Sequence, residues 1–91
     1  MRRAAKVDDN QEEIVKALRK IGVSVEIIGK PVDLLLWHRG HYSLMEIKNL
    51  EGRDRLTEDQ LKFIARWPGK IHIVHTPEQA IAEVLGKELM R

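Results

Sequence analysis

The sequence predicts an α/β domain in which helices cover a mixed four-stranded sheet. Three segments repeat apolar residues at helical spacing, four short apolar runs lie between them, and glycine or proline separates most of these segments. The length of 91 residues allows one domain, residues 1–91. Because a chain of this size buries a modest share of its surface, we expect a partner subunit and therefore a homodimer.

The helices are predicted from their caps and apolar spacing. They occupy about residues 10–21, the segment from Thr57 to Pro68, and the segment that opens with Thr76. Residues 8–10 offer N-caps for the first helix, and Gly22 stops its apolar repeat. Thr57 and Gln60 have the spacing of a capping box. The expected apolar stripe of the second helix is Leu61, Ile64 and Ala65.

The strands are predicted from short apolar runs that end at turn residues. They occupy residues 23–28, 32–37, 42–48 and 71–74. The run 32–37 is apolar on both faces except for Asp33, which indicates a central strand covered on both sides. A two-residue turn at Arg39-Gly40 makes this strand and the next a hairpin.

Composition excludes several functional classes. The net charge of +2, from 16 basic and 14 acidic residues, is too small to indicate nucleic-acid binding by itself. The absence of cysteine excludes disulfides and thiolate chemistry and fits a reducing compartment. The longest apolar run, Val32 to Trp37, is too short to span a bilayer, and no signal-type apolar stretch follows Arg2-Arg3. We therefore expect a soluble, cytoplasmic protein with no membrane partner.

Two acidic residues of the hairpin indicate a metal site. An aspartate in an apolar strand is costly to bury unless it is paired or binds a metal, so Asp33 requires a partner. Since the turn residues 39 and 40 add to 79, opposed residues also add to 79, and Asp33 falls opposite Glu46. Opposed residues share a face, with Cβ atoms about 4.5–5.5 Å apart. A divalent cation between the carboxylates would turn their repulsion into coordination.

Lys48 completes a site with hydrolytic chemistry. It shares the face of Glu46 because side chains alternate along a strand, while Met45 and Ile47 point the other way. Two carboxylates suit Mg²⁺ or Mn²⁺, which retain positions for water and a substrate phosphate. Lys48 is placed to orient or activate the attacking water and to contact the phosphate.

These residues resemble the PD-(D/E)XK nuclease superfamily. The pattern is Pro31-Val32-Asp33, a hairpin, then Glu46-Ile47-Lys48, with one residue inserted between the proline and the aspartate. The order of elements is similar to the restriction-endonuclease-like core of that superfamily, αβββαβ(α). The downstream segment 56–60 and the segment 67–70 look like those of small VRR-NUC and phage Holliday-junction-resolvase-like nucleases, and the likeness covers nearly the whole chain.

The resemblance implies roles for individual residues. The metal would be bound by Asp33, Glu46 and the main-chain carbonyl of Ile47, with Lys48 as the catalytic lysine. It also implies a polar residue from the first helix near the metal. The candidates are Gln11, Glu12 and Glu13, of which Gln11 ranks first because its spacing from Ile14 and Leu18 turns it inward. For Gln60, a helix-capping role and an active-site role are both open.

The expected activity is that of a magnesium- or manganese-dependent endodeoxyribonuclease. The resemblance suggests branched DNA as the substrate and a phage as the source. DNA backbone contacts are expected from Lys48, Arg53, Arg55, Arg39 and His38. Such contacts position a duplex without reading its bases.

Two other functions stay open, and the aromatic residues are assigned to packing. The fold also suits a catalytically inactive DNA-binding or regulatory protein. The pairs His38-x-x-His41 and His72-x-x-His75 admit a zinc module. Trp37, Phe63 and Trp67 are expected in the core or a dimer interface, because a nucleic-acid stacking platform needs exposed aromatics.

Overall fold

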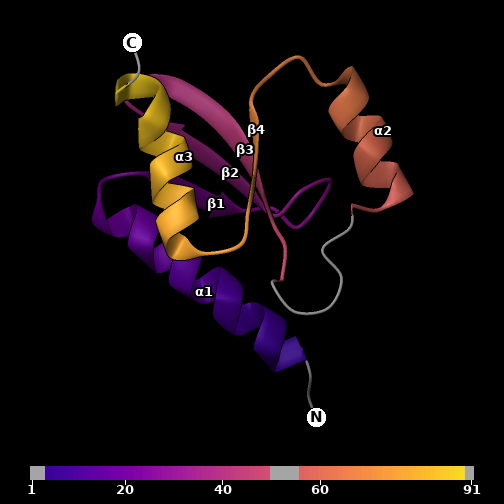
Figure 1. Ribbon diagram of the computed structural model, residues 1–91, viewed down its shortest axis with the longest axis horizontal. Helices are drawn as coiled ribbons and strands as arrows, with labels where there is room; N and C mark the ends of the chain where they lie inside the picture. Colours follow the sequence, from indigo (N-terminus) through magenta and orange to yellow (C-terminus); the bar gives the residue numbers. More distant parts are fainter. Residues whose placement is uncertain (1–3, 50–55, 90–91) are drawn as a thin grey trace.

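The computed structural model describes residues 4–49 and 56–89 and has the predicted order of helices and strands (Figure 1). Its elements are α1 (Ala4–Lys20), β1 (Ser24–Ile27), β2 (Leu34–His38), β3 (His41–Ile47), α2 (Glu58–Arg66), β4 (Ile71–Val74) and α3 (Pro77–Leu89). The prediction of an α/β chain with a mixed four-stranded sheet is confirmed.

The sheet is open and has the strand order β1-β2-β3-β4. The first three strands are antiparallel, and β4 pairs with β3 in parallel. Arg39 and Gly40 form the predicted two-residue turn, with positive φ angles of 51° and 84°. Two positive φ values in succession are typical of the turn that matches strand twist. His38 is therefore paired with His41 and Leu34 with Met45, so the predicted register is confirmed.

The main core lies between the sheet and the helices α1 and α3. Leu34, Leu36 and Met45 from the sheet are at most 1% exposed and pack with Ile14 and Leu18 of α1. Ala80 and Val84 of α3 close the same cluster. Burying each large side chain of this kind contributes about 1.5–3 kcal/mol. The face of the hairpin that carries Met45 is therefore fixed toward α1 and α3.

The second face of the sheet is covered only in part. Phe63 of α2 packs there with Leu44 and Val32 in a small separate cluster. In Figure 1, α2 stands on the side of the sheet away from α3. Leu35 and Trp37 of β2 are 37% and 41% exposed, so the prediction that this strand is covered on both sides is wrong. The cause is the short α2, which reaches only part of this face.

Two boundaries and the buried face of one helix differ from the prediction. Helix α1 begins at Ala4, so residues 8–10 lie inside it and are not N-caps, because helix-favouring residues such as Ala4 and Ala5 precede them. Asp33 lies in a bend just before β2, not inside the strand. In α2 the buried residue is Phe63, whereas Leu61 is 54% exposed, because the larger aromatic side chain faces the sheet.

None of the helices in the described part of the chain has both the length and the apolar character of a bilayer-crossing segment.

Candidate active site

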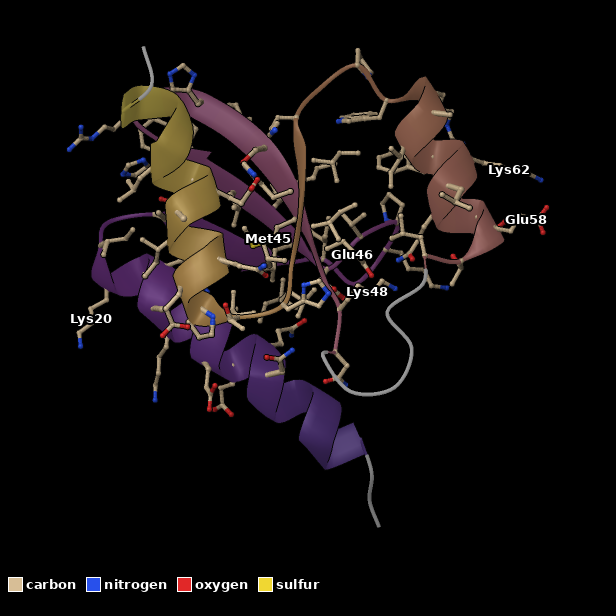
Figure 2. All side chains as sticks on the ribbon, viewed as in Figure 1. Lys20, Met45, Glu46, Lys48, Glu58 and Lys62 are labelled. Atoms are coloured by element: carbon tan, nitrogen blue, oxygen red, sulfur yellow. The ribbon has the colours of Figure 1, made fainter. Side chains whose placement is uncertain are left out.

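Asp33 and Glu46 approach each other at the open end of the β2–β3 hairpin. The last recorded pair of the ladder is Leu34 with Met45, and the next pair in the same register is Asp33 with Glu46. Met45 lies on the side of α3, whereas Glu46 and Lys48 lie on the side of α2 (Figure 2). The prediction that Glu46 and Lys48 share a face opposite to Met45 is confirmed.

Asp33 is held by the main chain of β3. The Ile47 N–H donates a hydrogen bond of 2.8 Å to Asp33 Oδ2. This hydrogen bond links the two strands beyond the last main-chain pair of the ladder, and it fixes the orientation of the Asp33 carboxylate. Burial, helped by the neighbouring Glu46, raises the pKa of Asp33 from 3.8 to about 6, against the lowering effects of the Ile47 N–H and of Lys48. The carboxyl group therefore takes up a proton at a higher pH than an ordinary aspartate does.

Glu46 is the most deeply buried acidic residue of the site, at 4% exposure. Its Oε2 lies 3.2 Å from Lys48 Nζ in an ion pair. Its Oε1 is buried and has no hydrogen-bond partner in the described part of the chain. A buried carboxylate oxygen without a donor is costly, and a cation would satisfy it.

Gln60 connects this site to α2. Its Oε1 accepts hydrogen bonds from Lys48 Nζ and from the Thr57 N–H, both at 3.2 Å. Its own N–H donates to Thr57 Oγ1 at 3.1 Å, which completes a capping box. The two roles left open for Gln60 are therefore compatible, since one side chain caps α2 and holds the lysine.

The donor set suits a hard divalent cation. Asp33 and Glu46 supply carboxylate oxygens, which Mg²⁺ and Mn²⁺ prefer. N–H and C=O groups of one strand residue point toward the same neighbouring strand, so the Ile47 carbonyl faces the Asp33 side with its N–H. Within the described residues, no group of three or more His, Cys, Asp or Glu side chains is placed to hold a metal. The residues that fit a cation here are thus two carboxylates and one main-chain carbonyl.

Gln11 lies in a different groove from the two acids. That groove is lined by Gln11, Val15 and Arg19 of α1 and by Ile27 of β1, and it includes neither Asp33 nor Glu46. Gln11 is half-buried, whereas Glu12 and Glu13 are exposed. Gln11 is thus only partly turned inward with Ile14 and Leu18, and its approach to a metal stays a prediction.

The predicted DNA-binding residues fall into three groups. Arg39 is exposed at the hairpin turn, where a backbone contact stays a prediction. His38 is 7% exposed and lines a cavity of about 70 Å³ on the α3 side, so its position does not suit contact with a DNA backbone. Alternation along β2 turns it to the face of Leu36. Arg53 and Arg55 lie outside the described residues.

The four histidines do not gather around one point. His38, His41 and His72 line the same small cavity with Lys70. His72 Nδ1 lies 2.9 Å from Glu83 Oε1, whereas His75 Nδ1 lies 3.2 Å from Gln79 Oε1. His75 does not line this cavity, so the second predicted pair does not join the first as a set of four histidines.

The comparisons with known proteins find no relative for this chain. The sequence matches no protein-family model, and no curated protein or solved structure is significantly similar to it. The functional reading therefore depends on the geometry of the site.

Sequence reasoning missed the residues that line a groove beside this site. Lys30, Lys62 and Arg66 line a groove between the β1–β2 loop and α2, together with Gln60. The signal for Lys62 and Arg66 was present, because residues four apart on a helix share a face. Lys30 comes from a distant loop, and only the folded chain brings it to them.

Proposed function

We propose that this chain is a divalent-cation-dependent nuclease with a restriction-endonuclease-like core, which hydrolyses phosphodiester bonds in DNA. The observation that carries the proposal is the buried Glu46 Oε1, which has no donor among the described residues and lies beside a second carboxylate whose pKa is raised to about 6. Two acids at the end of one hairpin destabilise the protein while they lack a cation. Such an arrangement is typical of functional sites.

Asp33, Glu46 and the Ile47 carbonyl would hold Mg²⁺ or Mn²⁺. When bound there, the ion supplies Lewis acidity and positive charge against the developing charge of the phosphate. The Ile47 N–H fixes the orientation of Asp33, so its second oxygen can point to the cation. Ion binding requires both acids to be ionised, so it should strengthen as pH rises through about 6.

Lys48 is the residue that would act on the substrate. Its ammonium has three N–H donors, and Glu46 and Gln60 accept two of them. The third can donate to a phosphate oxygen or to the attacking water. Because the side chain is only 14% exposed, this charge is weakly screened and acts strongly on a phosphate beside it.

A cleavage assay tests this proposal. Supercoiled plasmid and a labelled four-way junction are incubated with the protein in Mg²⁺, Mn²⁺ or EDTA. We expect cation-dependent cutting that Asp33→Asn, Glu46→Gln and Lys48→Met each reduce at least 100-fold. Glu26→Gln, which removes an exposed carboxylate of the same sheet, is the matched control and should cut normally. Binding without cutting, in any cation, would instead identify a DNA-binding protein with no nuclease activity.

The junction substrate also tests the expectations about DNA structure and assembly. Branched DNA presents two strands for cleavage, and a two-fold homodimer would bring one site to each. Preference for the junction over linear duplex, together with a dimer in analytical ultracentrifugation, is the expected result. Equal cutting of both substrates by a monomer would reject this part of the proposal and retain the nuclease.

A further inference from the structure

Two aromatic side chains stand exposed on the face of the sheet that carries the proposed active site. Trp37 of β2 and Tyr42 of β3 are cross-strand partners in the hairpin. They are 41% and 72% exposed, so of the two positions predicted for Trp37 the core of the single chain is wrong, and a dimer interface stays a prediction. The region is uncovered because α2 packs through Phe63 at Leu44 and Val32 instead.

The register relates this aromatic pair to the two acids. Alternation along β2 puts Trp37 and Leu35 on one face in successive rows, and Asp33 follows in the next row if the same register is continued beyond the strand. Their partners on β3 are Tyr42, Leu44 and, in the continued register, Glu46. Trp37 and Asp33 are four residue steps apart, which corresponds to about 13 Å of extended chain. Four nucleotides at the B-form spacing of about 3.4 Å cover this length, and fewer suffice in an extended strand.

A basic groove lies on the other side of the acids. Among the described residues it is lined by the basic Lys30, Lys62 and Arg66 and by one acidic residue, Asp59. It also includes Gln60, which contacts Lys48. The groove adjoins the acids through the contact of Gln60 with Lys48, whereas the aromatic pair lies next to the turn at the opposite end of the hairpin. Three cations against one carboxylate favour a phosphate backbone over an apolar partner.

We propose that this face binds an unpaired strand of nucleic acid, with bases stacked on Trp37 and Tyr42 and the backbone continuing past the acids into the basic groove. The inference rests on the proposed nuclease function and names its substrate as a single-stranded or unpaired segment. Aromatic side chains stack on any base, so such binding tolerates sequence. Bases inside a duplex already stack on their neighbours. Only unpaired bases therefore have ring surfaces free to stack on Trp37 and Tyr42.

A second copy of the chain is the alternative occupant of this face. It would have to cover Leu35, which is 37% exposed and lies in a row about 7 Å from the row of the two acids. Leu44, the partner of Leu35 in that row, is already covered by Phe63. A copy seated there would obstruct a phosphodiester on its way to Lys48. An unpaired nucleic-acid strand does not have this conflict, because one strand can contact both the aromatic pair and the two acids.

Tryptophan fluorescence tests the proposal directly. The chain has two tryptophans, so Trp67→Phe leaves Trp37 as the sole reporter. This variant is titrated in EDTA with a dT oligonucleotide and with a duplex of the same length. We expect the single strand to quench Trp37 strongly and the duplex to quench it weakly.

Fluorescence anisotropy with a labelled oligonucleotide measures the binding affinity, in proteins that keep Trp67. Trp37→Ala should weaken single-strand binding about 5- to 100-fold and leave duplex binding within about twofold. Leu61→Ala, which trims another exposed apolar side chain, is the matched control and should leave both unchanged. Circular dichroism checks that each variant is folded.

Three results would overturn the proposal: equal quenching by duplex and single strand, unchanged affinity in Trp37→Ala, or a Trp37 signal that depends on protein concentration without oligonucleotide. The last would identify a second copy on this face. Because binding is measured in EDTA, failure of the nuclease and failure of this surface are separable. Selective single-strand binding without cutting in Mn²⁺ would reject the nuclease activity alone. Cutting without selective single-strand binding would reject the proposed binding surface alone.

Discussion

Replacing Asp33 by asparagine should stabilise the metal-free protein while it abolishes cation-dependent cutting. Asparagine keeps an oxygen that can accept the hydrogen bond from the Ile47 N–H and removes the negative charge beside Glu46. The substitution therefore relieves repulsion without opening a cavity. A more stable but inactive protein is the outcome that distinguishes a cation site from an ordinary structural carboxylate.

The size of this effect follows from the pKa of Asp33. A rise from 3.8 to about 6 corresponds to an upper limit of about 3 kcal/mol. Because the residue is half-buried and solvent screens it in part, we expect about 1–2 kcal/mol. The folded-state pKa is above the unfolded one, so folding favours the protonated acid. The natural protein should gain stability as pH falls from 7 through 6, and the gain from this group should be complete below about 4.

Thermal unfolding in EDTA measures the prediction. At pH 7.5 the melting temperature of Asp33→Asn should exceed that of the natural protein by roughly 4–8 °C for each kcal/mol gained. The difference should vanish at pH 4, where the natural acid is protonated. Glu26→Gln controls for loss of a surface carboxylate and should shift the melting temperature little. An Asp33→Asn protein that melts at or below the natural one at pH 7.5 would refute the reasoning.

Three further substitutions probe other parts of the site and its hairpin. Lys48→Met should reduce single-turnover cleavage at least 100-fold and leave Mn²⁺ affinity within a few-fold, and parallel loss of both would contradict the role given to this lysine. Gln60→Ala should lower stability by about 1 kcal/mol in urea unfolding, whereas Gln60→Glu, which keeps an acceptor, should lower it less. Gly40→Ala should cost about 1–2 kcal/mol because φ is 84° there, whereas Gly86→Ala in α3, where a Cβ meets nothing, should be neutral or stabilising.

The sequence was sufficient to predict the hairpin and the residues that share its faces. The Arg39-Gly40 turn determines the pairing of every residue on β2 and β3, because a two-residue turn leaves one register. Strict alternation then puts Glu46 and Lys48 together and Met45 on the other side. These properties depend on local chemistry, which is why they could be read without a structure.

Properties that depend on how α2 packs against the sheet could not be predicted from the sequence in the same way. Trp37 and Leu35 look like core residues in the sequence, yet the short α2 leaves them exposed. Whether an apolar strand face is covered depends on where a distant helix packs, and in this chain Phe63 determines that position. The groove that combines Lys30 with Lys62 and Arg66 is likewise a product of tertiary packing.

Mn²⁺ binding to the natural protein tests the central claim most directly. Electron paramagnetic resonance counts free Mn²⁺ during a titration at pH 7.5 and at pH 5, with Glu46→Gln and Glu26→Gln in parallel. We expect about one ion per chain at pH 7.5, much weaker binding at pH 5, loss of binding in Glu46→Gln and normal binding in Glu26→Gln. Binding that survives in Glu46→Gln, or that is absent from the natural protein, would show that these acids do not form a cation site.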